Sequence, residues 1–508
     1  MIRWTGFIAC LLLCIGAEAQ VSYEKRLEIE LQDGYQNEKI HTFEGYGLLL
    51  SAEATDPASD WLTWKYDLYN TDLEKVKSAT VKVSAYFRME QQVTSEHHIH
   101  TLFHRKNHFV ISSIDVNTME EHKVSGKLPH GKELYNMSVA GDKAYFEMQF
   151  ISKRYLLIVN WITGELKEIP IKIPKVNSGF NIKGFHVLEE TGEAFVFAGI
   201  ESSTPTYDTY VLRISAEGEI AEIYSLSQML GKQLNKSSVS YLGEGHYAFA
   251  GTYYTQSKVT SEGLFFATVK NGQIEHKVTR AFGEIKDFTE YMPSSKKEKI
   301  EKKMEKRESK GEEYEISYSA VPHDMVSLSD GYLLLMEAFY PTFRQEQYMS
   351  TSTINGVSAT RPTTRNVFDG FQYTHAVLMK FDLNGQFAWE HTFRMWPFYK
   401  PSYVRRFISM RGFMTEQGEK SIRMVFSSYD KIISYTVDDQ GQSVGKRLES
   451  SIETGFPGDY KMTLPYSSLN YWYDNYFIAY GSQRIKNKGD EEVSKKRSVF
   501  FITKIGFE

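Results

Sequence analysis

The sequence predicts an all-β protein built from repeats. Short apolar strands and tight turns alternate along the chain, and the turns recur at a nearly constant step. Tyr (33) and Phe (32) are abundant while Pro (13) is scarce, a composition that favours half-buried strands over disorder. Units of this kind cannot bury their own faces, so we expect them to stack around a shared core.

The clearest unit covers residues 331–394, in which the strands GYLLLMEAFY, THAVLMKFD and FAWEHTF follow one another. Weaker copies precede and follow it. The central turn residues of the copies are Thr71, Thr118, Gly164, Gly218, Gly272, Gly385 and Gly441, separated by 47, 46, 54, 54, 113 and 56 residues. Glycine supplies the positive φ that tight hairpins need.

The long interval of 113 residues between Gly272 and Gly385 is explained by two insertions and not by an additional, unrecognised repeat. Residues 285–318 are mostly charged, and residues 341–373 are rich in Ser, Thr and Arg. Neither segment offers four strands with an apolar face. In the first insertion, Ser295 and Glu298 have the spacing of a capping box and Gly311 stands where a helix would end, which predicts a short charged helix.

Over nearly its whole length the chain resembles a β-propeller, with no motif of a functional family. The resemblance implies a single propeller of eight four-stranded blades, or seven as the alternative, because the copy at 407–450 has a poorly defined first strand. The last copy lacks a fourth strand, and the N-terminal segment SYEKRLEIELQ is a strand without a hairpin. We expect the two to pair and to close the ring.

Residues 1–19 have the basic start, apolar run and small-residue cleavage site of a signal peptide, which leaves residues 20–508 as the propeller domain. A lipid-anchoring cysteine is the alternative, although Cys14 follows leucine where a small residue is expected. Both cysteines lie in this segment, so the mature chain has no disulfide. These features predict export to a bacterial periplasm, cell surface or the extracellular space.

Five histidines crowd into EHHIHTLFHRKNH, and His98, His100 and His104 would share one face of an extended strand. Two imidazoles at i and i+2 can both reach a metal ion. Because no second group of ligands accompanies them, the sequence predicts a polar, solvated strand face near a blade's outer edge, with a metal site as the weaker alternative. We expect no cofactor.

Blade parity predicts where binding occurs. Turns between strands one and two, and between three and four, lie on one rim, and the other loops and the links between blades lie on the opposite one. The insertions 285–318, 341–373 and 483–497 all fall on this second rim, where loops carry function. The candidate ligand- or partner-binding residues near it are Tyr340, Arg344, His323, Tyr207 and Tyr254.

The sequence assigns no catalytic residue. His323 and Asp324 are adjacent, so their side chains point to opposite faces of an extended chain, which favours a structural role over a catalytic dyad. A net charge of -5 gives no basic field for nucleic acid, and after the signal no apolar run could span a bilayer. We expect a non-catalytic binding or scaffold propeller with a protein or glycan partner. The alternative is an enzyme acting on a glycan or peptide in the central funnel.

Overall fold

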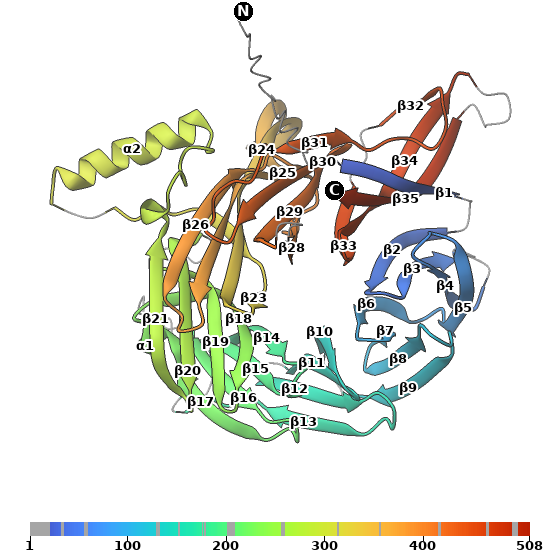
Figure 1. The fold of residues 1–508 in the computed structure, drawn as a ribbon, viewed down its shortest axis with the longest axis horizontal. Helices are drawn as coiled ribbons and strands as arrows, with labels where there is room; N and C mark the ends of the chain where they lie inside the picture. Colours follow the sequence, from blue (N-terminus) through green and yellow to red (C-terminus); the bar gives the residue numbers. More distant parts are fainter. Residues whose placement is uncertain are drawn as a thin grey trace, which may run out of the picture.

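The fold is a ring of eight antiparallel sheets (Figure 1). The computed structural model describes residues 21–31, 35–54, 59–128, 133–150, 153–174, 176, 179–200, 209–255, 260–311, 314–354, 357–414, 418–463, 467–489 and 496–507. Each sheet is formed by strands that are consecutive in the chain, except the last, which also takes the first strand of the described chain. The eight-bladed propeller predicted from the repeats is therefore confirmed, and the seven-bladed alternative is wrong.

The first four blades are regular. Their strands are β2 (Tyr35–Phe43), β3 (Gly47–Ala54), β4 (Trp61–Tyr69) and β5 (Lys75–Ser84) in blade 1; β6 (Arg88–Thr94), β7 (His98–Arg105), β8 (His108–Asp115) and β9 (Glu121–Lys127) in blade 2; β10 (Glu133–Ala140), β11 (Lys143–Phe150), β12 (Lys153–Asn160) and β13 (Leu166–Pro170) in blade 3; and β14 (Phe180–Val187), β15 (Ala194–Ile200), β16 (Thr209–Ile214) and β17 (Ile220–Ser225) in blade 4.

The second half carries the additions. Its strands are β18 (Gln233–Gly243), β19 (His246–Tyr254), β20 (Gly263–Lys270) and β21 (Gln273–Ala281) in blade 5; β22 (Ser319–Pro322), β23 (Val326–Leu328), β24 (Gly331–Ile354), β25 (Val357–Asp382), β26 (Phe387–Arg394) and β27 (Phe398–Tyr399) in blade 6; β28 (Ser409–Met414), β29 (Lys420–Ser428), β30 (Lys431–Asp438) and β31 (Leu448–Ser451) in blade 7; and β32 (Asp459–Lys461), β33 (Ser468–Tyr473), β34 (Tyr476–Asn487), β35 (Lys496–Phe507) and β1 (Val21–Glu30) in blade 8.

The N-terminal strand completes the last sheet. β1 pairs antiparallel with β35 from Val21 opposite Phe507 to Glu30 opposite Val499, which confirms the predicted pairing. In Figure 1 the blue strand β1 lies beside the red strand β35, next to the blue first blade. Apolar side chains of β1, including Leu27 and Ile29, pack in the cluster shared by blades 8 and 1.

The hydrophobic core is divided among the blade interfaces. A separate cluster of buried apolar side chains lies between each blade and the next, and between the last and the first. Each blade is apolar on both faces because it packs between two neighbours. This explains why the first six residues of the strand GLLLSAEA are all buried instead of alternating with exposed ones.

The predicted glycine turns adopt the backbone conformation that they were expected to need. Gly441 has φ of +75° and lies against the Trp389 ring, where an added Cβ would come within 2.5 Å of a ring carbon. No other residue would fit this turn without displacing the indole. The constant spacing of turns in the sequence thus marks the β-turns that join the third and fourth strands.

The first insertion contains the predicted charged helix, with a different start. After α1 (Leu226–Leu230) and η1 (Phe282–Glu284), helix α2 (Ser294–Glu308) links blades 5 and 6 and projects outside the ring (Figure 1). Its N-cap is Pro293, and no side chain caps its first turn, so the capping box predicted at Ser295 and Glu298 is wrong. Helix α2 is too polar to cross a bilayer, and none of the other described helices is long and apolar enough to do so.

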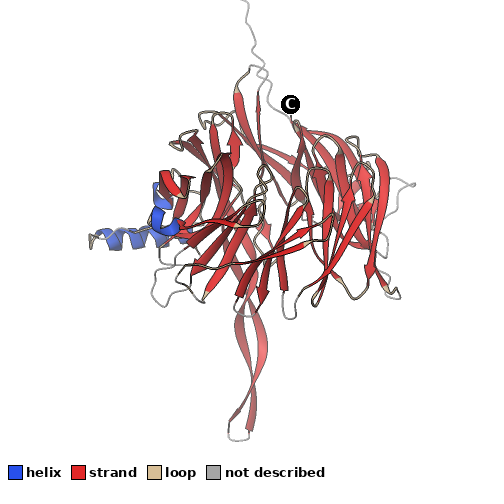
Figure 2. Ribbon diagram, turned by 90° about the horizontal axis from the view of Figure 1, so that it is seen from below, coloured by secondary structure: helices blue, strands red, loops and turns tan. Residues whose placement is uncertain are grey.

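The second insertion is a pair of long strands and not the loop that its composition predicted. β24 and β25 pair from Gly331 opposite Asp382 to Ile354 opposite Val357. Viewed edge-on, the ring carries a two-stranded extension that projects from one rim (Figure 2). We call residues 342–354 and 357–370 the ribbon. It joins the second and third strands of its blade, so it lies on the rim that parity predicted.

Candidate functional site

The ribbon is a two-stranded sheet with two unpaired edges. Within blade 6, β24 pairs with β22 only as far as Phe339, and β25 pairs with β27 and β26 only from Phe371 onward. Between these points, in the part of the chain that the structure describes, the strands of the ribbon pair only with each other. An unpaired strand edge presents backbone N–H and C=O groups that can pair with another chain.

The two faces of the ribbon differ in charge. Arg344, Glu346, Arg361 and Arg365 occupy one face, because Arg361 lies opposite Ser350 and Arg365 lies opposite Glu346. Arg344 donates to Glu346 over 2.6 Å and to Asp369 over 3.2 Å. Arg344, a predicted binding residue, therefore lies on the ribbon with part of its guanidinium already paired. The three arginines, Glu346 and Asp369 give this face a net charge of about +1.

The opposite face of the ribbon is uncharged. It contains Phe343, Gln345, Gln347 and Met349 from β24, and their partners on β25 are Phe368, Asn366, Thr364 and Pro362. The Phe343 side chain is 61% exposed and that of Met349 is 65% exposed. Large apolar side chains at this exposure, on a surface without charges, are typical of a protein-binding surface.

Only one edge of the ribbon is open to strand addition. The carbonyl of Leu335 accepts from the His323 amide of the neighbouring strand, so odd-numbered residues of β24 direct their backbone groups away from β25. Met349 is one of them, and its partner on β25 is Pro362, which has no N–H to donate. The β25 edge is thus blocked by proline. The β24 edge has no proline between residues 343 and 354.

The base of the ribbon is fixed to the propeller by aromatic contacts. Phe339, Phe371, Phe368 and Phe343 contact one another in series, with ring centroids 5.3, 4.9 and 6.2 Å apart. Tyr340, another predicted binding residue, lies against Lys296 of helix α2.

Helix α2 is held to Tyr340 by a cation–π contact. The Lys296 ammonium lies 3.6 Å from the centre of the Tyr340 ring and 5.1 Å from that of Tyr318. Burial, aided by the nearby charge of Lys299, lowers the pKa of Lys296 to about 8. The aromatic faces compensate this ammonium for lost water without a carboxylate.

His323 and Asp324 have separate partners, as predicted from their opposite orientations. His323 Nε2 lies 2.7 Å from Glu337, whose fully buried carboxylate also accepts from the amides of Phe407 and Ile408 at 2.8 Å. Asp324 accepts from Arg406 at 2.6 and 3.2 Å. Both carboxylates anchor the link between blades 6 and 7.

The contacts of Asp324 and Glu337 matter for the alternative hypothesis that the chain is an enzyme. His186, from the first strand of blade 4, lies near both charges of the Arg406–Asp324 pair, and Lys236, from the first strand of blade 5, lies near the charge of Arg406. His186 contacts the Ser237 carbonyl at 2.7 Å. The carboxylates of Asp324 and Glu337 already bind structural partners. To act as a general acid or base, either carboxylate would first have to break these contacts.

The histidine strand is buried rather than solvated. β7 is the second strand of its blade, and His100 is fully buried, with its ring nitrogens 2.9 Å from Ser95 and 2.7 Å from Ser113. The His98 ring contacts that of Trp161 in a tilted arrangement, and His104 lies 3.8 Å from Glu90. The predicted exposed face is therefore wrong, because serines satisfy His100 inside the blade. Among the described residues, no three metal-binding side chains gather at one point.

Buried histidines predict acid sensitivity. Burial lowers the pKa of His41 to about 4 and those of His100 and His375 to about 3. The unfolded chain, with a histidine pKa of about 6.5, then binds protons that the folded chain does not. The contribution of these histidines to the free energy of unfolding is therefore fully present above pH 6.5 and is lost as the pH falls towards 4.

We expect each of these histidines to contribute a slope of about 1.4 kcal/mol per pH unit in that window. Urea unfolding of the His375→Phe variant between pH 7.5 and 4.5 should show a shallower slope than the parent. His108→Phe, at an exposed histidine, is the control. An unchanged slope in His375→Phe would contradict the burial argument.

The remaining predicted residues do not join the ribbon. Tyr254 is 4% exposed and lies 5.7 Å from the Lys183 ammonium, so its ring offers no free face for stacking. Tyr207 lies outside the described residues. The Ser/Thr/Arg composition that marked an insertion was the available signal for the ribbon. The alternation of charged and uncharged residues from Phe343 to Gln347 was the signal for its first strand.

Comparisons with known proteins add no functional assignment. No family model and no curated protein matches the chain. Solved structures match at low identity. Dihydro-heme d1 dehydrogenase NirN in complex with DHE has 11% identity and a TM-score of 0.41, over 94% of this chain and 78% of that one. The β-propeller domain of the Trilobed protease from Pyrococcus furiosus has 9% identity and a TM-score of 0.35 (81% of this chain, 97% of that one), and the Dos1 propeller has 9% identity and a TM-score of 0.38 (78% and 79%). These likenesses concern the fold only.

Proposed function

We propose that this chain is a non-catalytic binding scaffold of a bacterial cell envelope, which holds a protein partner by adding a strand of that partner to the β24 edge of the ribbon. The observation that carries the proposal is the open β24 edge beside a proline-blocked β25 edge. Strand addition draws its affinity from backbone hydrogen bonds and its specificity from alternate side chains.

The ribbon by itself has few interactions that stabilise it. A two-stranded hairpin in water is marginally stable, and this one extends beyond the ring without a third strand. A strand added at the β24 edge would make it three-stranded and would cover part of the exposed Phe343 and Met349 side chains. Both changes favour a bound state over the isolated ribbon.

The ribbon also indicates the chemistry of the partner strand. On one face the partner strand would meet uncharged side chains, and on the other it would meet the arginine face with its net charge of about +1. A strand that alternates uncharged and acidic residues fits both faces. The predicted signal peptide and the absence of cysteine after it support the proposal that this partner belongs to the envelope.

An edge-specific substitution tests this mode of binding. Gln347→Pro removes an outward-facing N–H of β24, so we expect at least a tenfold loss in capture of the envelope partner, equivalent to about 1.4 kcal/mol. Thr364→Pro, opposite Gln347 on the already blocked β25 edge, and Gln347→Thr, which keeps the N–H, should capture it as the parent does. Quantitative mass spectrometry of the captured partner gives the readout. Undiminished capture by Gln347→Pro would refute strand addition at this edge.

A further inference from the structure

Helix α2 has its lysines and its glutamates on separate flanks. One flank has a row of lysines spaced by four and three residues, which we call the lysine row: Lys299, Lys303 and Lys306. A second row, the glutamate row, is spaced by three and four residues: Glu298, Glu301 and Glu305. Residues at these spacings lie on one side of a helix, and the two rows are about a third of a turn apart. Charges that are interleaved in the sequence are therefore segregated on the helix surface.

The lysine row has no counter-charge. All three of its side chains are exposed, and none of them makes an ion pair or a hydrogen bond within the described part of the chain. Lys299 and Lys303 are four residues apart, a spacing at which like charges destabilise a helix. As a whole, α2 has seven basic and four acidic residues and thus a net charge of +3. An uncompensated positive row of this kind is typical of a surface that meets an anion.

The apolar side of α2 is already used by the propeller. Ile300 and Met304 are the only apolar residues of the helix, and Ile300 packs against the core cluster shared by blades 5 and 6. On the same side, Lys296 lies over the Tyr340 ring. Since the helix stands outside the ring (Figure 1), both charged rows face solvent, and α2 has no free apolar face that could enter a membrane.

We infer that the lysine row binds a linear acidic polysaccharide, whose carboxylates lie along the row over about 10 Å of the helix axis. A linear chain can contact the lysine row alone, whereas a flat anionic membrane would also meet Glu298 and Glu305 on the outermost side of α2. The helix has no aromatic residue on which nucleic-acid bases could stack. It also presents no apolar anchor for a protein partner. A hydrophilic polyanion fits all of these features.

Titration calorimetry of the mature chain with polygalacturonate tests the inference. At about 0.01 M salt, where charges act over about 30 Å, we expect polygalacturonate to bind and the neutral polysaccharide dextran not to bind. Raising the salt to about 1 M should abolish the binding, because the charges are then screened within about 3 Å. The inference is overturned if polygalacturonate does not bind up to about 1 mM of sugar units, if dextran binds equally, or if phosphatidylglycerol vesicles bind more tightly.

Two matched triple variants locate the ligand. Changing all three residues of the lysine row to Gln should weaken polygalacturonate at least tenfold, since each exposed charge contact contributes part of that factor. Changing all three residues of the glutamate row to Gln alters the net charge by the same amount but should change the affinity less than about threefold. Gln is close to Lys and Glu in helix propensity, and thermal unfolding confirms that both variants are folded. Equal and opposite effects of the two variants would show that net charge, and not the lysine row, governs binding.

A double variant separates this site from the ribbon, on whose function the inference does not depend. Arg361→Gln with Arg365→Gln removes two positive charges from the ribbon and should leave the affinity for polygalacturonate unchanged. If this double variant loses polygalacturonate while the variant of the lysine row keeps it, the polyanion binds at the ribbon and the inference is wrong.

Discussion

Removal of residues 21–31 from the mature chain should abolish cooperative unfolding and cause aggregation. Strand β35 would lose its β1 partner along its whole paired length and expose an apolar edge from Val499 to Phe507. Leu27 and Ile29 would leave the cluster between blades 8 and 1. Because the ion pair between Glu28 and Arg497 is lost as well, we expect the free energy of unfolding to fall by about 5 kcal/mol or more.

The ion pair is part of the reason for so large an effect. Arg497 is held between Glu28 of β1, at 2.8 Å, and Asp459 of β32, at 2.6 Å, and all three side chains are less than a tenth exposed. Without Glu28, this buried guanidinium keeps one of its two carboxylates. Carboxylates on both sides raise the pKa of Arg497, so it stays charged and needs them.

Differential scanning calorimetry of the truncated chain provides the measurement. A matched pair separates the ion pair from the strand: Glu28→Gln should lower the free energy of unfolding by about 1–3 kcal/mol. Glu30→Gln should change it by less than about 0.5 kcal/mol, because Glu30 is exposed and has no ion-pair partner among the described residues. A truncated chain that melts like the complete one would show that β1 does not support the ring.

The repeated strands could be predicted because burial leaves a pattern in the sequence. A strand such as GYLLLMEAFY is apolar at nearly every position because blades cover both of its faces, and glycines mark the turns between strands. The missing fourth strand of the last copy, and the N-terminal strand without a hairpin, were visible in the same way. These signals are local, which is why blade number and the β1–β35 pairing could be predicted from them.

The ribbon escaped prediction because neither of its faces is buried. From Phe343 to Thr351 its side chains are mostly exposed, so the sequence shows no apolar face from which a strand could be recognised. The burial of His100 was missed for a different reason. Its partners, Ser95 and Ser113, are brought to it by the turn before β7 and by strand pairing, which no local pattern reveals.

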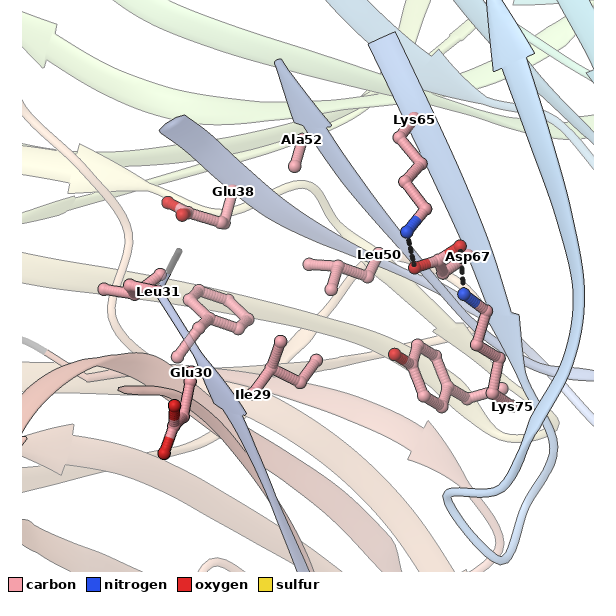
Figure 3. Close-up of a pocket in the computed structure, with 11 residues that line it drawn as sticks. Ile29, Glu30, Leu31, Glu38, Leu50, Ala52, Lys65, Asp67 and Lys75 are labelled. Atoms are coloured by element: carbon pink, nitrogen blue, oxygen red, sulfur yellow. Dashed lines mark ion pairs between the residues drawn. The ribbon is translucent and has the colours of Figure 1, made fainter. Parts of the chain in front are cut away.

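A pocket of about 280 Å³ lies where β1 meets blade 1 (Figure 3), and it was also beyond sequence reasoning. Its lining combines Ile29 and Phe500, which are distant in the chain and meet only because the first strand joins the last blade. The meeting of Lys65 and Lys75 at Asp67 depends on pairing between β4 and β5.

The role of the ribbon as the binding element is tested most directly by removing it. Replacing residues 343–369 with a four-residue Gly-Ser turn joins Thr342 to Gly370, which already pair, and leaves blade 6 intact. Capture of partners from the native envelope, compared with the complete chain by quantitative mass spectrometry, gives the measurement. A control variant, Glu190→Ala with Glu244→Ala, alters two tight turns on the opposite rim.

We predict that the chain without the ribbon melts within a few degrees of the parent, since the ribbon contributes few buried contacts, and that it captures no partner. The control variant should capture the partner normally. If the chain without the ribbon still captures the partner while the control variant does not, binding occurs at the opposite rim and the proposed function of the ribbon is wrong.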